Sequence, residues 1–427
     1  MANKQTNFIY HIHPEKVPAS TIRFTHTFGL GGMALVLFLL QIVTGILLKF
    51  VYEPTPDKAY DSILFMQNHL LFGHYIRNIH HLSGTLLIFV ALFHLLRVFF
   101  TEAFYGPRSS NWIIGVVIFI IILFSNFTGY LLPWDQLSYW AVTVVTQMLS
   151  YIPVVGPELT SFVRGGKEVG AATLLTFFNF HTAVLPFALI ILLLFHFWKV
   201  RQAGGVVVPR NRNHNGKGII PVVPELVVRE LVTGLILLAV IFLLAVFIDA
   251  PLRERANPAY SPNPAKAPWY FLGIQELIMH FHPFIGVVII PVTLFTLLFY
   301  LPCFPFRIRN TGIWFSSSKG RKMALISALL ALVIHPILIV ASEYLIHFNT
   351  WFPSLLPVIS GGLFPLILYS IIFLLYLFYI IRRYKPLSNE IVQAVFVYFL
   401  VTYTVLSITA IFFRGPGMAL MWPWKIS

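Results

Sequence analysis

The chain contains 427 residues, of which 58% are hydrophobic and only 10% are charged. Soluble domains usually carry about 25% charged residues, so this composition excludes a soluble enzyme, a disordered chain and a nucleic-acid-binding module. The single cysteine, Cys303, excludes an intrachain disulfide, a thiolate iron–sulfur site and a CxxCH haem attachment. The net charge of +14 is informative only through its placement, because Lys and Arg collect on the cytoplasmic side of membrane proteins.

Stretches of about 20 apolar residues predict membrane-spanning helices. Nine stretches qualify, at about 29–51, 76–100, 112–132, 176–198, 227–248, 283–301, 323–346, 362–381 and 391–413. The first thirty residues are polar and lack an apolar core before a cleavage site, so no removable signal peptide is predicted. With the N-terminus inside, eighteen of the 29 Lys and Arg fall in inner segments and eight in outer ones. This bias predicts an all-α, multi-pass membrane protein that is N-inside and C-outside.

The connections between the spans predict how the chain is organised. Two long outer loops, 133–175 and 249–282, are rich in Trp and Tyr and suit amphipathic helices that lie in the membrane interface. The inner connection 199–226 is basic and rich in Gly, Pro and Asn, which is typical of a linker. We therefore expect a four-helix module at 1–205, a second module at 206–301 and three accessory helices at 302–427.

Four histidines lie inside two of the predicted spans, where polar residues are costly and indicate function. His80 and His94 are 14 residues apart in the second span, and His181 and His196 are 15 apart in the fourth. At ~100° per residue each pair shares one helix face, yet its members lie ~21–23 Å apart along the axis. Two such helices side by side would give two bis-imidazole sites stacked across the bilayer.

Haem is the cofactor that takes two opposed imidazoles as axial ligands. Zinc or di-iron centres would need further ligands or carboxylates, and these two spans contain no Asp or Glu. For any one of these histidines alone, a hydrogen bond to a neighbouring helix is the simpler explanation. The matched spacing of two pairs favours haem, and with it metal ligation by all four histidines.

Glycines and arginines repeat the histidine pattern. Gly31 and Gly45 in the first span, and Gly115 and Gly129 in the third, are each 14 residues apart. Glycine allows a flat macrocycle to approach the helix backbone, although glycines in spans also serve ordinary helix packing. Arg77 and Arg97 each lie three residues from a predicted ligand, where they could pair with haem propionates or simply extend to the interface.

Over about residues 20–300 the sequence resembles the cytochrome b family, the quinol-oxidising membrane subunit of cytochrome bc and bf complexes. The motifs are QIVTG at 41–45, RNIH at 77–80, HLLR at 94–97, GYLLPWDQLSYW at 129–140, IPVVG at 152–156, GGKEVG at 165–170, HTAVLP at 181–186 and Trp269-Tyr270. The 15-residue interval and Asp135 are more similar to cytochrome b6, and the part at 206–301 would then be like its subunit IV. The resemblance implies that His80 pairs with His181 on an outer haem and His94 with His196 on an inner haem. His81 falls where the family has another residue, so we expect it not to be a ligand.

The resemblance also implies an outer quinol-oxidising site. One wall would come from 129–140, including Tyr130, and the other from Pro268, Trp269 and Tyr270. The family's Pro-Glu-Trp-Tyr motif reads Ala267-Pro268-Trp269-Tyr270 here, so Pro268 stands in place of its proton-accepting carboxylate. Glu276, two turns further on, is our hypothesis for a substitute, the alternative being an interfacial Glu at a helix start.

On the inner side, Arg201 and Glu230 are candidates for holding or protonating a quinone, although charges at inner helix ends are expected in any case. Gly29 replaces the cysteine that tethers an extra haem in b6 proteins, which argues against a covalently attached third haem. Thr176 replaces an Arg of the family.

The resemblance therefore implies two non-covalent b haems, a quinone with menaquinone among the candidates, and electron transfer coupled to proton translocation. The expected partners are a Rieske-type iron–sulfur protein, a c-type cytochrome and a second copy of the chain in a homodimer, in a prokaryotic plasma membrane. Two alternatives stay open: a dihaem membrane anchor of a dehydrogenase or hydrogenase, and a transporter with intramembrane histidines.

Overall fold

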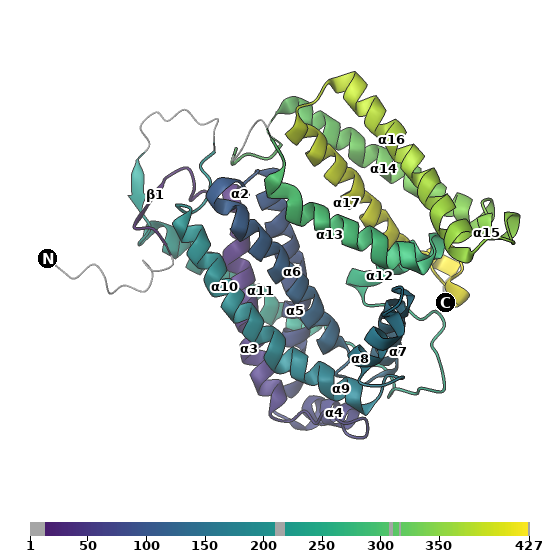
Figure 1. Ribbon diagram of the computed structural model, residues 1–427. Coiled ribbons are helices and arrows are strands. Elements are labelled where there is room, and N and C mark those ends of the chain that lie inside the picture. The colour runs from purple at the N-terminus through teal and green to yellow at the C-terminus, as the bar shows by residue number, and fades with distance from the viewer. Residues whose placement is uncertain (1–12, 210–217, 307–310, 316, 426–427) are drawn as a thin grey trace. The chain divides into compact units, whose positions relative to one another are not determined.

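The computed structural model describes residues 13–209, 218–306, 311–315 and 317–425, and nearly all of them lie in helices or the turns between them (Figure 1). Among these residues, nine helices are long and apolar enough to cross a membrane. They are Leu30–Lys49, Gly73–Phe100, Gly106–Tyr130, Ala171–Gln202, Glu225–Phe247, Phe284–Cys303, Ser318–Tyr344, Ile359–Tyr384 and Ser388–Phe412. Each overlaps one predicted span, so the predicted all-α membrane fold with nine spans is confirmed. Basic residues at 210–217 and 307–310, which the orientation count used, lie outside the described residues, and the orientation stays a prediction.

The chain folds into two compact units that interleave along the sequence. The first contains residues 1–133, 177–252 and 308–314, and the second contains 134–176, 253–307 and 315–427. Most of both aromatic-rich loops therefore belongs to the second unit, together with the last four spans. The three sequential modules expected above do not coincide with these units and stay a prediction.

The first unit is a bundle built around α5 (Gly73–Phe100), which packs against α3 (Leu30–Lys49), α6 (Ser109–Tyr130) and α11 (Glu225–Phe247). Helix α10 (Leu185–Gln202) packs on α6, and Figure 1 shows these helices side by side. Shorter elements complete the unit: β1 (Lys16–Pro18) paired antiparallel with β2 (Ile219–Pro221), α2 (Phe24–Thr27) and α4 (Ala59–His69). The helices are apolar almost all round, as expected where one face meets lipid and the other meets neighbouring helices.

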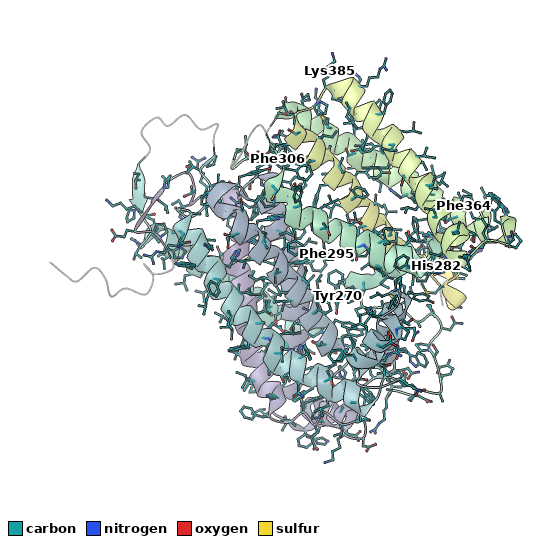
Figure 2. All side chains as sticks on the ribbon, viewed as in Figure 1. Tyr270, His282, Phe295, Phe306, Phe364 and Lys385 are labelled. Carbon is teal, nitrogen blue, oxygen red and sulfur yellow. The ribbon has the colours of Figure 1, made fainter. Side chains whose placement is uncertain are left out.

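The second unit contains α7 (Gln136–Met148), α8 (Gly156–Arg164), α12 (Leu272–His280), α13 (Ile290–Tyr300), α14 (Ser318–Tyr344), α15 (Phe348–Trp351), α16 (Phe364–Tyr384) and α17 (Ser388–Phe412). Helix α17 packs along α14 and also contacts α12 (Figure 1). The core of the second unit includes Met323, Tyr376, Ile380 and Tyr398 from α14, α16 and α17. Figure 2 labels Phe364 and Lys385 at opposite ends of α16.

Three of the long helices contain a π-helical turn, at Phe180–Val184, Phe284–Ile289 and Ile359–Leu363. The first joins α9 (Ala171–Asn179) to α10. Each turn ends two residues before a proline, namely Pro186, Pro291 and Pro365. A proline cannot donate an α-helical hydrogen bond and its ring crowds the carbonyl four residues earlier, so a wider turn there relieves the clash. Pro336 shows that the turn is not obligatory, because it lies inside α14 without one.

Candidate haem sites and quinol-site segment

The four span histidines meet in two pairs within the first unit. The ring centroids of His80, on α5, and His181, in the π-helical turn, are 6.1 Å apart, and those of His94 and His196 are 6.3 Å apart. The two rings of each pair are steeply inclined, at 80° and 72°. Metal–nitrogen bonds of about 2.0 Å on each side of one ion place two imidazole centroids about 6 Å apart. Both pairs therefore fit the two axial positions of a haem iron.

Each histidine faces one glycine of the 14-residue pattern. A Cβ added at Gly129 would lie 2.5 Å from His181 Cε1, and one at Gly45 would lie 3.3 Å from His80 Cε1. The corresponding distances are 3.4 Å from Gly31 to His94 and 3.6 Å from Gly115 to His196. The glycines on α3 and α6 thus make room for the imidazoles themselves, in addition to any macrocycle.

Hydrogen bonds fix the tautomer of the first pair. His181 Nδ1 lies 2.8 Å from the Ser125 carbonyl oxygen, which can only accept, so Nδ1 carries the proton. His80 Nδ1 lies 2.8 Å from Thr44 Oγ1, and that hydroxyl already donates to the Leu40 carbonyl at 2.7 Å. The Thr44 oxygen therefore accepts from His80 Nδ1–H. In both rings Nε2 keeps its lone pair for a metal, with the other nitrogen held as ligating histidines usually are.

The second pair, His94 and His196, differs from the first in its hydrogen bonding. His196 Nδ1 is buried without a hydrogen-bond partner among the described residues. An imidazole held in an apolar setting with an unused nitrogen is costly unless a ligand compensates for the lost hydration. Across the described residues, no group of three or more His, Cys, Asp or Glu side chains could hold a metal ion. Two donors per site suit a metal whose remaining ligands come from a macrocycle.

The two arginines beside the ligands are buried and hold loops at opposite ends of α5. Arg77 donates to the carbonyl oxygens of Ala250 and Pro251, at 2.8 and 2.6 Å, and so holds the chain that leaves α11. Arg97 donates from Nε to the His26 carbonyl at 3.3 Å, and its Nη2 lies 3.3 Å from His26 Nε2. The predicted pairing with propionates stays a prediction.

In the second unit, Asp135 fixes the start of α7. Its carboxylate accepts from Ser138 N at 2.8 Å, while Ser138 Oγ accepts from Asp135 N, which forms a capping box. The other carboxylate oxygen accepts from Arg253 N at 2.9 Å. Gln136 binds the same segment, because its Oε1 accepts from Asn257 N at 2.6 Å. The beginning of α7 and segment 253–260 are therefore held together.

Helix α7 and the Trp269-Tyr270 turn also meet within this unit. Val145, on α7, packs in one apolar cluster with Ala267, Trp269 and Leu272. Trp269 and Tyr270 form a short 3₁₀ turn that runs directly into α12, and Tyr270 and His282 flank that helix in Figure 2. The turn is held from behind by α17, because Tyr403 Oη donates to the Tyr270 carbonyl at 2.7 Å.

Glu276 is completely buried, unlike an ordinary interfacial residue at a helix start. Its carboxylate forms a bidentate pair with Arg414, from Nε at 2.9 Å and Nη2 at 2.7 Å, and lies 3.1 Å from His280 Nε2. Burial alone would raise the pKa of this carboxyl, but the hydrogen bonds from His280 and Arg414 outweigh it and hold the pKa below its usual value. Its role as a proton acceptor stays a prediction.

The remaining predicted residues differ in their exposure. Arg201 is exposed in the last turn of α10, and the exposed Glu230 pairs with His13 at 3.3 Å. Tyr130 is half-buried at the end of α6, and His81 is exposed on α5. Gly29 has a left-handed φ of 65°, which any side chain would find strained.

Sequence reasoning missed three residues of these sites. Thr44 lies in an apolar span, and nothing in the sequence shows that its hydroxyl meets His80. Arg414 follows the last span and is 138 residues from Glu276, so no local pattern connects them. Arg164 is buried and ties α7 to α8 through donors to Thr146 Oγ1 at 2.8 Å and the Lys167 carbonyl at 3.1 Å. Arg164 is only 18 residues from Thr146, and this closeness in sequence was the signal that could have indicated their contact.

Comparison with known proteins identifies the family. The family model described as Cytochrome b/b6/petB matches residues 16–204. Cytochrome b6 of Synechocystis sp. is 42% identical over 175 residues, which are 41% of this chain and 79% of that protein. Cytochrome b6 of Synechococcus elongatus is likewise 42% identical over 175 residues, which are 41% of this chain and 81% of that protein.

A solved structure described as a hyperthermophilic respiratory Complex III has the same fold. It aligns with a TM-score of 0.67 and 24% identity, covering 91% of this chain and 94% of that chain. The fold likeness therefore covers far more of the chain than the 41% that the b6 sequence matches. Taken with the paired imidazoles, these matches show that the chain belongs to the cytochrome b/b6 family of membrane-embedded haem proteins of electron transport.

Proposed function

We propose that this protein is the dihaem cytochrome b subunit of a bc-type quinol:cytochrome c oxidoreductase. The observation that carries the proposal is the pairing of four histidines at centroid separations of 6.1 and 6.3 Å, each facing a glycine. Non-covalent b haems would be held by His80 with His181 and by His94 with His196. When bound, such haems accept and pass on single electrons.

The chain's own groups have three tasks in this proposal. The Nδ1–H bonds of His80 and His181 hold the rings and leave Nε2 free, so that it could bind a haem iron. Gly31, Gly45, Gly115 and Gly129 leave the space those rings need. Arg77 and Arg97, buried at the two ends of α5, put positive charge near each site, which would favour the reduced form of a bound haem.

We further propose that quinol is oxidised beside the Trp269-Tyr270 turn, with Pro268 and the α7 segment as walls. The role of Tyr130, at the end of α6, stays a prediction. Oxidation of a quinol releases two protons, and the carboxylate of the family motif is absent because Pro268 stands in its place. Glu276 is the buried carboxylate that follows the turn, so it is the candidate acceptor. Arg201 and Glu230 are candidates for holding quinone at the opposite side.

The proposed setting is a prokaryotic plasma membrane with the N-terminus inside. A Rieske-type iron–sulfur protein, followed by a c-type cytochrome, would take one of the two electrons that quinol releases at the outer site. The complex would contain two copies of this chain. Menaquinone is a candidate substrate, and proton release outside with uptake inside would couple turnover to the membrane potential.

The test compares two adjacent histidines in the assembled complex. His80→Ala should lower the haem-to-protein ratio from two toward one and abolish electron transfer from quinol to cytochrome c. His81→Ala, the matched control on the same helix, should leave both unchanged. Full haem content in His80→Ala would refute the proposal.

The dihaem-anchor alternative is separated by inhibitor sensitivity. Stigmatellin-like compounds, which block the quinol-oxidising site of bc complexes, should stop quinol-to-cytochrome c turnover. A complex that exchanges electrons with quinone through a peripheral dehydrogenase, insensitive to such compounds, would favour the anchor. A purified protein lacking b-haem absorbance would leave the transporter.

A further inference from the structure

Arg414, which follows α17 in the second unit, has no solvent exposure. Its guanidinium makes the bidentate pair with Glu276 on α12. Nη1 donates to Glu343 Oε2 and to the Met418 carbonyl, both at 2.9 Å. One side chain thus joins α12, α14 and the segment after α17.

The cost of burying these charges indicates more than general stabilisation. A buried ion pair commonly contributes no more stability than apolar residues of similar volume, because desolvation offsets the attraction between the charges. The planar guanidinium instead fixes an orientation, because its N–H donors point in set directions and can bind the two carboxylates in only one arrangement. Arg414 therefore fixes the rotation and height of α12 relative to α14.

The orientation of α12 is transmitted to the Trp269-Tyr270 turn through Gln275, the residue before Glu276. Gln275 Oε1 accepts from Ala267 N at 2.7 Å, and its Nε2 donates to the Ala265 carbonyl at 2.8 Å. A rotation of α12 would thus displace the backbone on the N-terminal side of Pro268. The turn continues into α12 at its other end, so both of its ends depend on that helix.

Helix α17 supports the same segment by three further contacts. Tyr403 binds the Tyr270 carbonyl, and Lys266 Nζ donates to the Ile411 carbonyl at 3.0 Å. A Cβ at Gly273 would lie 2.6 Å from the Tyr403 ring and 2.7 Å from Ser407 Oγ, so α12 lies directly against α17.

We propose that Arg414 is a positioning residue for the quinol-oxidising site, and that α17 with its C-terminal extension supports the Trp269-Tyr270 wall. This inference rests on the proposed function and gives the last accessory helix a role in it. Arg414 acts through Glu276 and Gln275 and has no contact with substrate in this assignment. Loss of its fork should loosen the wall and weaken quinol binding, while the haems of the first unit remain in place.

The experiment uses the assembled complex and measures KM and kcat for quinol, together with haem content and the reduced-minus-oxidised spectrum. Arg414→Gln should raise KM about tenfold or more with two haems retained. Arg414→Lys, which keeps the charge but loses the fork, should lie between this variant and the parent. Arg382→Gln, an exposed arginine of the same unit, is the control and should match the parent.

A haem-replete Arg414→Gln complex with the parent's KM and kcat would overturn the inference. If that variant does not assemble, Tyr403→Phe decides, because it removes only one hydroxyl: KM should rise about threefold, and an unchanged KM overturns the inference. A parent complex that retains its haems but does not oxidise quinol would refute the proposed function itself, before any variant is compared.

Discussion

Gly129→Ala is the most direct test of how the haem sites are built. The new methyl carbon would lie 2.5 Å from His181 Cε1, 2.9 Å from Nδ1 and 3.0 Å from Nε2. Ordinary contact begins at 3.4 Å, so the ring must withdraw by about 0.9 Å. Metal–ligand distances are held within about 0.2 Å, several times less than this displacement.

The substitution should therefore weaken one haem site and leave the other intact. In a helix, replacing Gly by Ala ordinarily stabilises by about 0.5–1 kcal/mol, so a loss of haem cannot be attributed to a weaker helix. The haem-to-protein ratio, measured as the pyridine haemochrome, should fall from two toward one.

The other glycines provide a graded series. The effect of an alanine should decrease in the order of the Cβ distances, from Gly45 at 3.3 Å to Gly31 at 3.4 Å and Gly115 at 3.6 Å. Gly32 has nothing within 4 Å of an added Cβ, so Gly32→Ala is the matched control. Two haems retained in Gly129→Ala, or equal losses in Gly129→Ala and Gly32→Ala, would contradict this account of the glycines.

Two further predictions follow from hydrogen bonds. Thr44→Val removes the acceptor for His80 Nδ1–H, and loss of such a hydrogen bond typically costs 10–100-fold in metal affinity. In a redox titration one haem potential should shift and the other should stay, whereas Thr44→Ser should behave as the parent. Two unchanged potentials in Thr44→Val would be inconsistent with the assigned tautomer. The lowered pKa of Glu276 means that its ion pair stabilises the fold above the ordinary carboxyl pKa and that this contribution is lost as pH falls through the lowered value. The acid-induced fall in thermal stability should thus be smaller in Glu276→Gln, and identical pH profiles would show that the pair contributes nothing.

The sequence predicted the spans well because crossing a membrane imposes a length and composition that can be read locally. It also predicted that the histidines of the second and fourth spans would meet in two pairs, since periodicity along one helix defines a shared face. It did not predict what each glycine faces, because periodicity gives a direction and not the residue met there. Gly129 was expected to leave room for a macrocycle, and it lies against His181.

The network around Arg414 could not have been predicted from sequence for a different reason. Glu276 and Arg414 were each visible as charges at the ends of predicted helices, where charges are common. Their pairing depends on how α17 packs against α12, a tertiary contact between segments more than a hundred residues apart. The same applies to the two interleaved units, because the return of the chain at residue 177 leaves no compositional boundary.

The π-helical turn at Phe180–Val184 reconciles the unequal histidine intervals. Its closing hydrogen bond runs from Leu185 N to the Phe180 carbonyl, five residues back, so the turn holds one residue more than an α-helical turn. His181 and His196 are 15 residues apart across this surplus residue, and His80 and His94 are 14 apart on the regular helix α5. The two intervals therefore turn through about the same angle and cover about the same length of helix, so each histidine of one helix lies opposite its partner on the other.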